Sequence, residues 1–238
     1  MFELRVKYKL FICKKTLYNF LSKMNITFKK ARKKIVPNVS GLLEKKILLN
    51  KRIQEIKNRQ QTIISIDESS FKLNMCQNYG WSIKGTKTNF IIDNTKSATY
   101  SVLCAIDKNK VIGKIIVKGS INSDIFISFL KKFIPKNKKC TLLLDNARIH
   151  KSCIFQQYIK TTKIELIYNI PYNPESNPIE HVFNKVKCIV RREPTNTVQL
   201  LEIAINKGFT SITKSNLYKF YNASFNTLSN NKIHDDKI

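Results

Sequence analysis

Three acidic residues occur at positions where carboxylates could bind metal ions. Asp67 and Asp145 each follow a mostly apolar, strand-like run, and Glu180 follows Asn177-Pro178-Ile179, with 34 residues between Asp145 and Glu180. Carboxylate oxygens are the ligands that hard divalent cations such as Mg²⁺ prefer. Three carboxylates and a phosphate can hold two such ions about 3.5–4 Å apart, one at the attacking oxygen and one at the leaving oxygen. The trio therefore predicts a catalytic, metal-binding site that cuts phosphodiesters.

Each member of the trio also has a simpler interpretation. Asp67 could form a turn after a strand, and Glu68 competes with it because neighbouring strand residues point to opposite faces. Asp145 could start an Asp-Asn turn. Glu180 stands at the third position of a helix that Asn177 would cap, which makes a capping box. Capping does not exclude metal ligation, since both can occur at a helix N-terminus.

The elements that must position these residues are predicted from residue 60 onward by alternating strand-like and helix-like periodicity. They follow the order of a ribonuclease H-like core, which is a mixed α/β sheet with flanking helices. Because ligands gather at the carboxyl ends of parallel strands, and adjacent strands lie about 4.8 Å apart, we expect Asp67 and Asp145 to be neighbours. The predicted strands are 62–67, 69–73 with 82–83, 99–106, 111–117, 141–145 and 164–168, and the predicted helices are 125–133, 151–160 and 178–192.

An amphipathic helix is predicted near the N-terminus, because Leu17, Phe20, Leu21 and Met24 recur with the spacing of one buried helical stripe, and Thr16 could cap it. A basic run follows. This pattern suits the second helix of a helix-turn-helix, with cations on the flanking phosphates. A solvated basic helix packed on the main domain is the open alternative. The candidate DNA contacts in the run are Lys29, Lys30, Arg32, Lys33 and Lys34.

The net charge indicates a polyanionic partner. There are 43 Lys and Arg residues against 16 Asp and Glu residues, a formal charge of +27, whereas solubility asks for a magnitude of about 2–8. Residues 1–60 hold 17 of the basic residues and 3 of the acidic ones. Such a field favours nucleic acid. A membrane partner is disfavoured, since no run approaches about 18 consecutive apolar residues and no basic helix has a broad apolar face.

Length and cysteine usage bound the architecture. A chain of 238 residues can form one substantial domain with an appendage. The six cysteines are scattered without a Cys-x-x-Cys pair or a preceding signal peptide, so we expect reduced thiols in an intracellular protein. We expect the protein to be located with DNA, in a nucleus, nucleoid or viral factory. The predicted organisation is a basic helical DNA-binding segment over 1–59, a catalytic domain over 60–215 and a polar C-terminal tail over 216–238.

Taken with their flanking residues, the three acids resemble those of the transposases of the mariner superfamily and their bacterial insertion-sequence relatives. These are DDE enzymes, named for an acidic triad. Trp81 and Gly85 downstream of the first acid also match. The matching stretches are Ile66-Asp67-Glu68-Ser69-Ser70-Phe71, Leu144-Asp145-Asn146-Ala147-Arg148-Ile149-His150 and the segment from Pro171 to Phe183, which contains Asn177-Pro178-Ile179-Glu180.

The resemblance implies that Asp67, Asp145 and Glu180 form the catalytic triad on a ribonuclease H-like fold, working with two Mg²⁺ or Mn²⁺ ions. In such enzymes metal-activated water hydrolyses DNA at the element ends, and the freed 3′-hydroxyl attacks target DNA. The implied partners are double-stranded DNA, as transposon ends and as target, and a second copy of the chain in a homodimer.

Two other functions stay open. Family members usually carry a paired helix-turn-helix region before the catalytic domain, and only about its last part fits into residues 1–40, which predicts a truncated chain. A truncated chain could be a catalytically silent DNA-binding remnant. A structure-selective nuclease of the same fold would cut without joining.

Asn146 and His150, which follow Asp145, are further candidate DNA contacts. Asn146 could instead shape the turn after the strand. A histidine near a helix start is about as often a cap or packing residue as a contact to phosphate.

Overall fold

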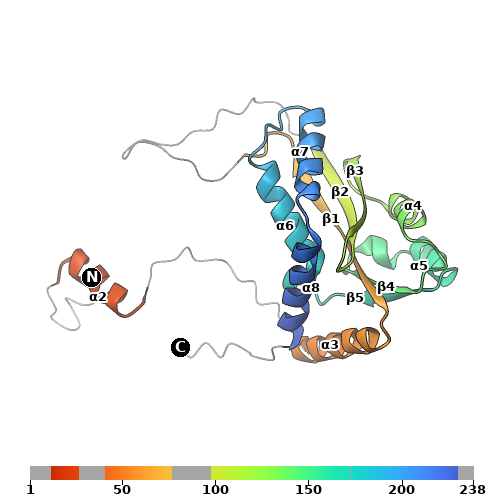
Figure 1. Cartoon of the computed structure of the whole chain (residues 1–238), viewed down its shortest axis with the longest axis horizontal. Coiled ribbons are helices and arrows are strands. Elements are labelled where there is room, and N and C mark those ends of the chain that lie inside the picture. Colours follow the sequence, from red (N-terminus) through yellow and green to blue (C-terminus); the bar gives the residue numbers. More distant parts are fainter. Residues whose placement is uncertain (1–11, 27–40, 77–97, 172, 230–238) are drawn as a thin grey trace. The chain divides into compact units, whose positions relative to one another are not determined.

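The computed structural model describes residues 12–26, 41–76, 98–171 and 173–229 (Figure 1). The chain divides into two compact units, residues 1–38 and residues 39–238. Within the described segments, no helix has the length and apolar character needed to cross a membrane. The predicted strand 82–83 lies outside the described residues, and so do the predicted positions Lys29, Lys30, Arg32, Lys33, Lys34, Trp81 and Gly85.

In the first unit, Lys14–Lys23 form helix α2. Its N-cap is Cys13, whose Sγ accepts a hydrogen bond from the Thr16 backbone N–H (3.4 Å), so the predicted cap at Thr16 is wrong. Phe20 and Met24 of the predicted apolar stripe are exposed. Within the described part of this unit, α2 buries none of its residues, and its apolar stripe therefore has no core there.

A five-stranded mixed sheet forms the centre of the second unit. Its strands are β1 (Thr62–Lys72), β2 (Thr99–Ile106), β3 (Val111–Lys118), β4 (Cys140–Leu144) and β5 (Ile164–Tyr168), in the order β3-β2-β1-β4-β5. The pairs β1–β2 and β2–β3 are antiparallel, whereas β1–β4 and β4–β5 are parallel. The predicted mixed α/β sheet is therefore confirmed.

Strand β1 is longer than predicted and carries Asp67 in its interior. Residues 62–65 pair with residues 140–143 of β4, and residues 65–72 pair with β2. Strand β4 ends just before Asp145, but β1 continues because β2 still supplies hydrogen-bond partners along its other edge. The prediction that Asp67 ends a strand is therefore wrong, and the sequence predicted as two short strands forms one.

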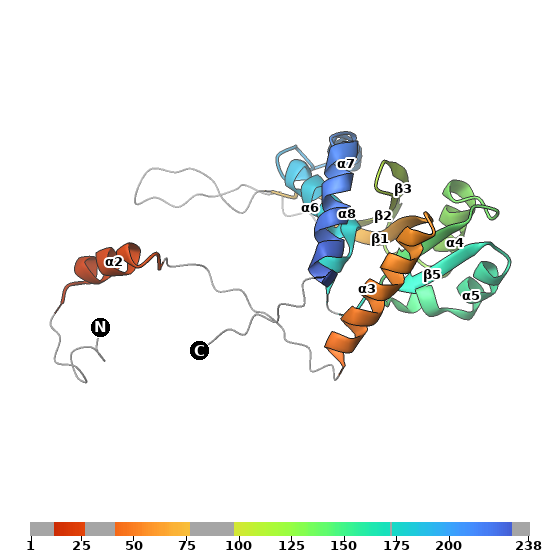
Figure 2. The ribbon, with the colours of Figure 1, turned by 60° about the horizontal axis from the view of Figure 1, so that its bottom comes forward.

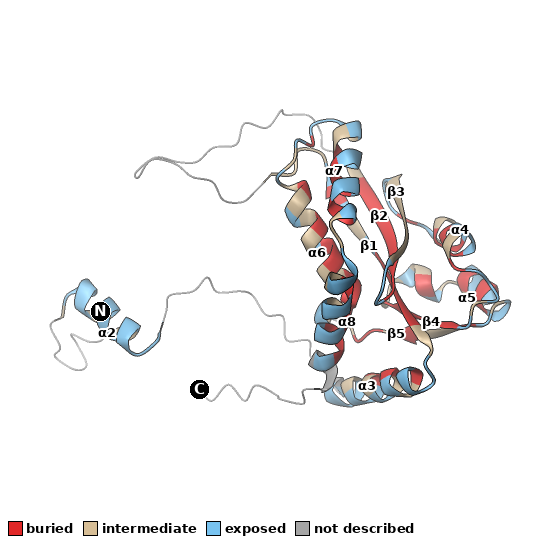
Figure 3. Cartoon of the chain, viewed as in Figure 1, coloured by how far each residue is buried: buried red, intermediate tan, exposed pale blue. Residues whose placement is uncertain are grey.

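Helices cover both faces of the sheet (Figures 1 and 2). One face carries α4 (Ser123–Phe133) and α5 (Cys153–Lys160), and the other carries α3 (Leu42–Asn58), α6 (Pro178–Val190), α7 (Val198–Thr210) and α8 (Lys214–Ser229). Buried residues line the surfaces between these layers (Figure 3).

The residues of β1 alternate between the two faces, as the period of a strand requires. Ile64 and Ile66 pack with α4 and α5, whereas Ile63 and Phe71 pack with the helices of the other face. By the same alternation Asp67 belongs to the face covered by α6.

Helix α3 belongs to the same unit as the sheet, which differs from the predicted boundary after residue 59. Ile53 and Ile56 are fully buried in the cluster formed by α6, α7 and α8. Arg52 and Arg59 lie 3.3 and 3.4 Å from the Glu165 carboxylate of β5. These two charges, which were predicted to serve DNA docking, therefore help to hold α3 against the sheet.

The predicted polar tail from residue 216 is wrong over most of its length, because Lys214–Ser229 form α8. Leu217, Tyr221 and Phe225 are spaced four residues apart and are buried in the core with α3 and α6. This spacing was present in the sequence and predicts a buried helical stripe.

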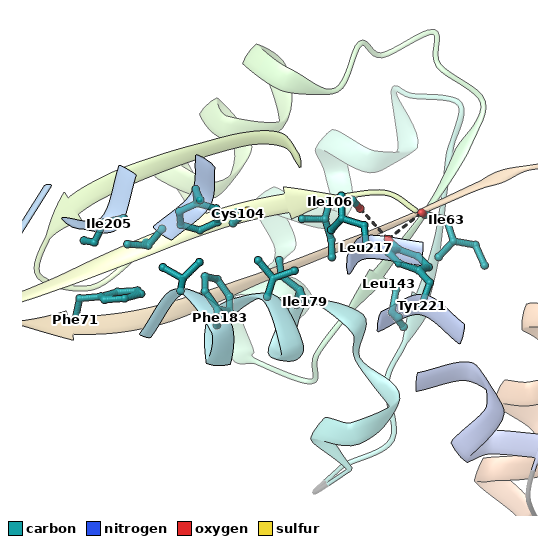
Figure 4. Packing of buried hydrophobic residues seen from close by; sticks show 14 of the residues in the cluster. Ile63, Phe71, Cys104, Ile106, Leu143, Ile179, Phe183, Ile205, Leu217 and Tyr221 are labelled. Atoms are coloured by element: carbon teal, nitrogen blue, oxygen red, sulfur yellow. Dashed lines mark hydrogen bonds between the residues drawn. The ribbon is translucent and has the colours of Figure 1, made fainter. Parts of the chain in front are cut away.

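The hydroxyl of Tyr221 ties α8 to the sheet (Figure 4). It lies 2.8 Å from the carbonyl oxygen of Ile106 and 3.2 Å from that of Ile63, and it accepts a hydrogen bond from the Ser65 backbone N–H (3.2 Å). These groups lie where the pairing of β1 with β2 begins, so α8 satisfies buried polar groups at the centre of the sheet.

Candidate active site

The three predicted acids line one cavity of about 650 Å³. Asp67 comes from β1, Asp145 directly follows β4, and Glu180 lies in the first turn of α6. Ser65 pairs with Leu143, and continuing this register by two residues puts Asp67 and Asp145 at the same level of adjacent strands. The predicted meeting of the two aspartates at this edge of the sheet therefore agrees with the structure.

Asp67 is the buried member of the trio, with 8% of its surface exposed. Its Oδ1 accepts a hydrogen bond from the Glu68 backbone N–H (2.7 Å), and its Oδ2 accepts one from the Asn177 side-chain amide (3.0 Å). Burial, followed by the negative charge of Asp145, raises the pKa of Asp67 to about 8. Ionised Asp67 therefore lacks a compensating positive charge among the described groups around it.

Asp145 has different surroundings, with 45% of its side chain exposed. Its Oδ1 accepts hydrogen bonds from the ring Nδ1 of His150 (2.8 Å) and from the Ala147 backbone N–H (3.0 Å). Partial burial acts to raise the pKa of Asp145, but these hydrogen bonds and the His150 and Lys151 charges outweigh it and lower the pKa below its ordinary value.

His150 is part of the core. It is 2% exposed, and its ring packs on Phe126 and Phe155 with centroid separations of 4.6 and 6.3 Å. Its backbone carbonyl accepts hydrogen bonds from Tyr168 Oη (2.9 Å) and Gln156 Nε2 (3.0 Å). The burial of the ring and its contact with Asp145 fit the packing interpretation of His150, and a contact with DNA stays a prediction.

Asn146 lines the cavity, half-buried, at the turn after β4. Its Nδ2 donates to the Asn169 carbonyl oxygen, and its Oδ1 accepts from Lys151 Nζ (3.0 Å). These partners fit the turn-shaping interpretation of Asn146. A contact with DNA stays a prediction.

The capping-box interpretation of Glu180 does not agree with the structure. Within the described part of the chain, the Asn177 side chain makes no hydrogen bond to the first turn of α6. In a capping box the Glu180 side chain would accept a hydrogen bond from the Asn177 backbone N–H. That N–H instead donates to the Pro174 carbonyl oxygen (2.9 Å). Glu180 therefore keeps its carboxylate for the cavity that it lines.

A single buried residue organises the loop between β5 and α6. Asn169 donates its backbone N–H to the Leu144 carbonyl oxygen (2.7 Å) and its Nδ2 to the Asn173 carbonyl oxygen (3.0 Å), while its Oδ1 accepts from Ser176 Oγ and from the Ile170 N–H (2.9 Å). Sequence reasoning missed Asn169, although a polar residue directly after a strand was visible. The loop is thereby fixed before α6 begins.

Among the described residues, no three His, Cys, Asp or Glu side chains approach closely enough to hold a metal ion by themselves. The three acids are instead distributed around the cavity wall. Substrate and water would have to complete any coordination sphere there, as is usual for Mg²⁺.

A protein-family model described as DDE superfamily endonuclease matches residues 62–201, which include all three acids. This chain belongs to that family. The match extends from β1 into α7, so it covers the whole sheet and the cavity.

A curated relative is the "Insertion element IS630 uncharacterized 39 kDa protein" of Shigella sonnei, which is 26% identical over 155 residues. The match covers 63% of this chain and 44% of that protein, so the chain spans less than half of the relative's length. The predicted similarity to bacterial insertion-sequence proteins is confirmed.

Solved structures with a similar fold include a Mos1 transposase paired-end complex with left transposon end, with a TM-score of 0.75 and 14% identity over 95% of this chain and 72% of that chain. The catalytic domain of Mos1 mariner transposase gives a TM-score of 0.60 at 13% identity, over 85% of this chain and 94% of that domain. These similarities confirm the predicted ribonuclease H-like fold.

Proposed function

We propose that this chain is a DNA transposase that cleaves DNA at transposon ends and transfers the strand into target DNA. The observation that carries the proposal is the meeting of Asp67, Asp145 and Glu180 on one cavity within a region that matches the DDE superfamily endonuclease family. The Mos1 transposase, which has a similar fold, has been solved in complexes with its transposon end and in complexes with Mg or Mn.

A divalent cation fits the donor set of the cavity. The three acids offer only carboxylate oxygens, which Mg²⁺ and Mn²⁺ accept as ligands. Burial raises the pKa of Asp67, which means that its charged form is destabilised in the protein. A bound cation would stabilise that form. We therefore assign Asp67, Asp145 and Glu180 as the residues that would hold the metal, with two ions as the expected number.

Bound ions would supply the activation of the attacking oxygen and the stabilisation of the leaving oxygen. The protein residues have the complementary task of holding the carboxylates in place. Asn177 and the Glu68 N–H orient Asp67, and His150 and the Ala147 N–H orient Asp145. Glu180 is positioned by the loop that ends at α6.

Double-stranded DNA is the proposed partner, both as transposon ends and as target. The formal charge of +27 supports it, because such a field attracts phosphate backbones. We propose that the basic N-terminal region supplies DNA affinity, and that two copies of the chain act together in a homodimer, as the mariner resemblance implies.

The direct test is an assay of strand cleavage and strand transfer on element-end DNA with Mg²⁺, comparing the wild type with Asp145→Ala. We expect metal-dependent cleaved and joined products from the wild type and neither from the variant. Equal activity in the two proteins would refute the assignment. Cleaved products without joined ones would indicate a nuclease.

A further inference from the structure

Asn177, the N-cap residue of α6, does not cap its helix as asparagine usually does. Asn is among the preferred N-cap residues because its side chain accepts a hydrogen bond from the first turn. Asn122 does this at α4, where its Oδ1 accepts from the Ile125 N–H (2.9 Å). Asn177 occupies the same position at α6, yet among the described residues it makes no such bond.

The Asn177 side chain points instead into the sheet and joins two residues of β1. Its Oδ1 accepts a hydrogen bond from Ser65 Oγ, and its Nδ2 donates to Asp67 Oδ2 (3.0 Å). All three residues are buried, with exposed fractions of 0% for Ser65, 2% for Asn177 and 8% for Asp67. The amide is thus completely enclosed and bonded at both ends.

This arrangement fixes the orientation of the amide. Asn177 can accept only through Oδ1 and donate only through Nδ2. Because an ionised carboxylate can only accept, the Nδ2 group faces Asp67, and the Ser65 hydroxyl, which can donate, faces Oδ1. A buried polar network in which every member has a partner holds its groups in one arrangement.

The same residue is also the start of the helix that carries Glu180. The Glu180 backbone N–H donates to the Asn177 carbonyl oxygen (3.1 Å). The first turn of α6 has fewer N–H groups to satisfy, because Pro178 has none and the Glu180 N–H is already bonded to the Asn177 carbonyl oxygen. Asn177 therefore contacts Asp67 through its side chain and Glu180 through its backbone.

We propose that Asn177 is a positioning residue that sets the orientation of Asp67 and its separation from Glu180 before metal binds. Ser65 completes the link by orienting the amide. The role of Asp67 and Glu180 as metal ligands rests on the proposed function. The hydrogen bonds that link Asn177 to Asp67 are present in the protein without metal.

The experiment measures Mn²⁺ binding to the full chain by isothermal titration calorimetry. Asn177→Ala should raise the Kd for Mn²⁺ by about 10- to 100-fold, the usual effect of removing a group that orients a metal ligand. Asn122→Ala, which removes a true cap at a residue that does not line the cavity, should leave the Kd within about twofold of the wild type. An unchanged Kd in Asn177→Ala would overturn the proposal.

Asn177→Ser separates positioning from capping. Serine is as good an N-cap as asparagine, but it has no amide that could join Ser65 to Asp67. Positioning predicts that Asn177→Ser binds Mn²⁺ as weakly as Asn177→Ala. Wild-type binding by Asn177→Ser would mean that the residue serves the helix alone.

A double-mutant cycle tests the link without metal. Urea unfolding in chelator would compare Asn177→Ala in the wild type and in Asp67→Ala, and we expect a smaller shift of the midpoint in the second background. Additive shifts would overturn the link. If the wild type fails to bind Mn²⁺ while the cycle shows coupling, the proposed metal site falls and the Asn177–Asp67 link stands.

Discussion

Asp67 lies on the side of the sheet that α6 and α8 support, whereas Asp145 takes its ring hydrogen bond from a histidine packed among residues of α4 and α5. Asp67 is buried and its pKa is raised, while Asp145 is about half exposed and its pKa is lowered. The two neighbouring carboxylates thus have opposite electrostatic surroundings.

The difference shows how one cavity can keep two close carboxylates in a folded protein. Although partial burial disfavours it, the charged form of Asp145 is stabilised by hydrogen bonds from His150 and the Ala147 N–H and by the positive charge of Lys151, which lower its pKa. Among the described residues, the hydrogen-bond donors to Asp67 are two neutral groups, the Glu68 N–H and the Asn177 amide. We infer that metal binding stabilises chiefly the Asp67 side, and the following changes test that comparison.

The largest effect is expected from Asp67→Asn, which keeps the shape of the side chain but removes the charge. Cleavage of element-end DNA should fall by more than about 100-fold, because loss of a ligand exceeds the effect of losing its supporting residues. Glu68→Gln is the matched change at the next residue of β1, which also lines the cavity, and should cost much less because Asp67 is the assigned ligand. Equal losses from the two variants would contradict the assignment of Asp67 over Glu68.

His150→Ala probes the other side of the site. It removes a buried ring that packs on Phe126 and a hydrogen bond to Asp145, so unfolding in urea should show a loss of about 2–4 kcal/mol. The Kd for Mn²⁺ should rise about tenfold or more. His181→Ala, at a half-buried ring stacked on Phe220, is the control and should leave Mn²⁺ affinity unchanged.

Tyr221→Phe tests the support of β1 by α8. The change removes one hydroxyl and leaves the Ile106 carbonyl and the Ser65 N–H without this buried partner. We expect the free energy of unfolding to fall by about 1–3 kcal/mol, as measured by urea denaturation. Unchanged stability would show that α8 contributes apolar contacts alone. Tyr218→Phe, an exposed tyrosine on the same helix, serves as the matched control.

The smallest effect is expected from Asn146→Ala, at the exposed edge of the Asp145 side. Loss of its hydrogen bond to the Asn169 carbonyl should cost about 0.5–1.5 kcal/mol of stability. DNA affinity, measured at two salt concentrations, should stay within about twofold of the wild type. A large loss of affinity with unchanged stability would support the prediction that Asn146 contacts DNA and contradict a purely turn-shaping role.

Local patterns predicted much of this molecule. The apolar run over residues 62–66 predicted a strand and the helical spacing after residue 178 predicted a helix, and the structure has β1 and α6 there. The spacing of Leu217, Tyr221 and Phe225 follows the same rule, so α8 was predictable from the sequence. By contrast, the burial of His150 was not readable, because it depends on Phe126 from a different helix.

The sequence by itself determined the three acids, the order of strands and helices along the chain and the basic character, because periodicity and residue type are local properties. Only the tertiary structure decided that β1 continues past Asp67, that His150 bonds to Asp145, and that the Asn177 side chain bonds to Asp67 and not to the first turn of its own helix. Asn177 and Asp67 are 110 residues apart in the chain, and their hydrogen bond exists because packing α6 on the sheet buries both groups together. Hydrogen bonds of this kind form because distant segments pack together and bury their polar groups, and no single segment of sequence carries that information.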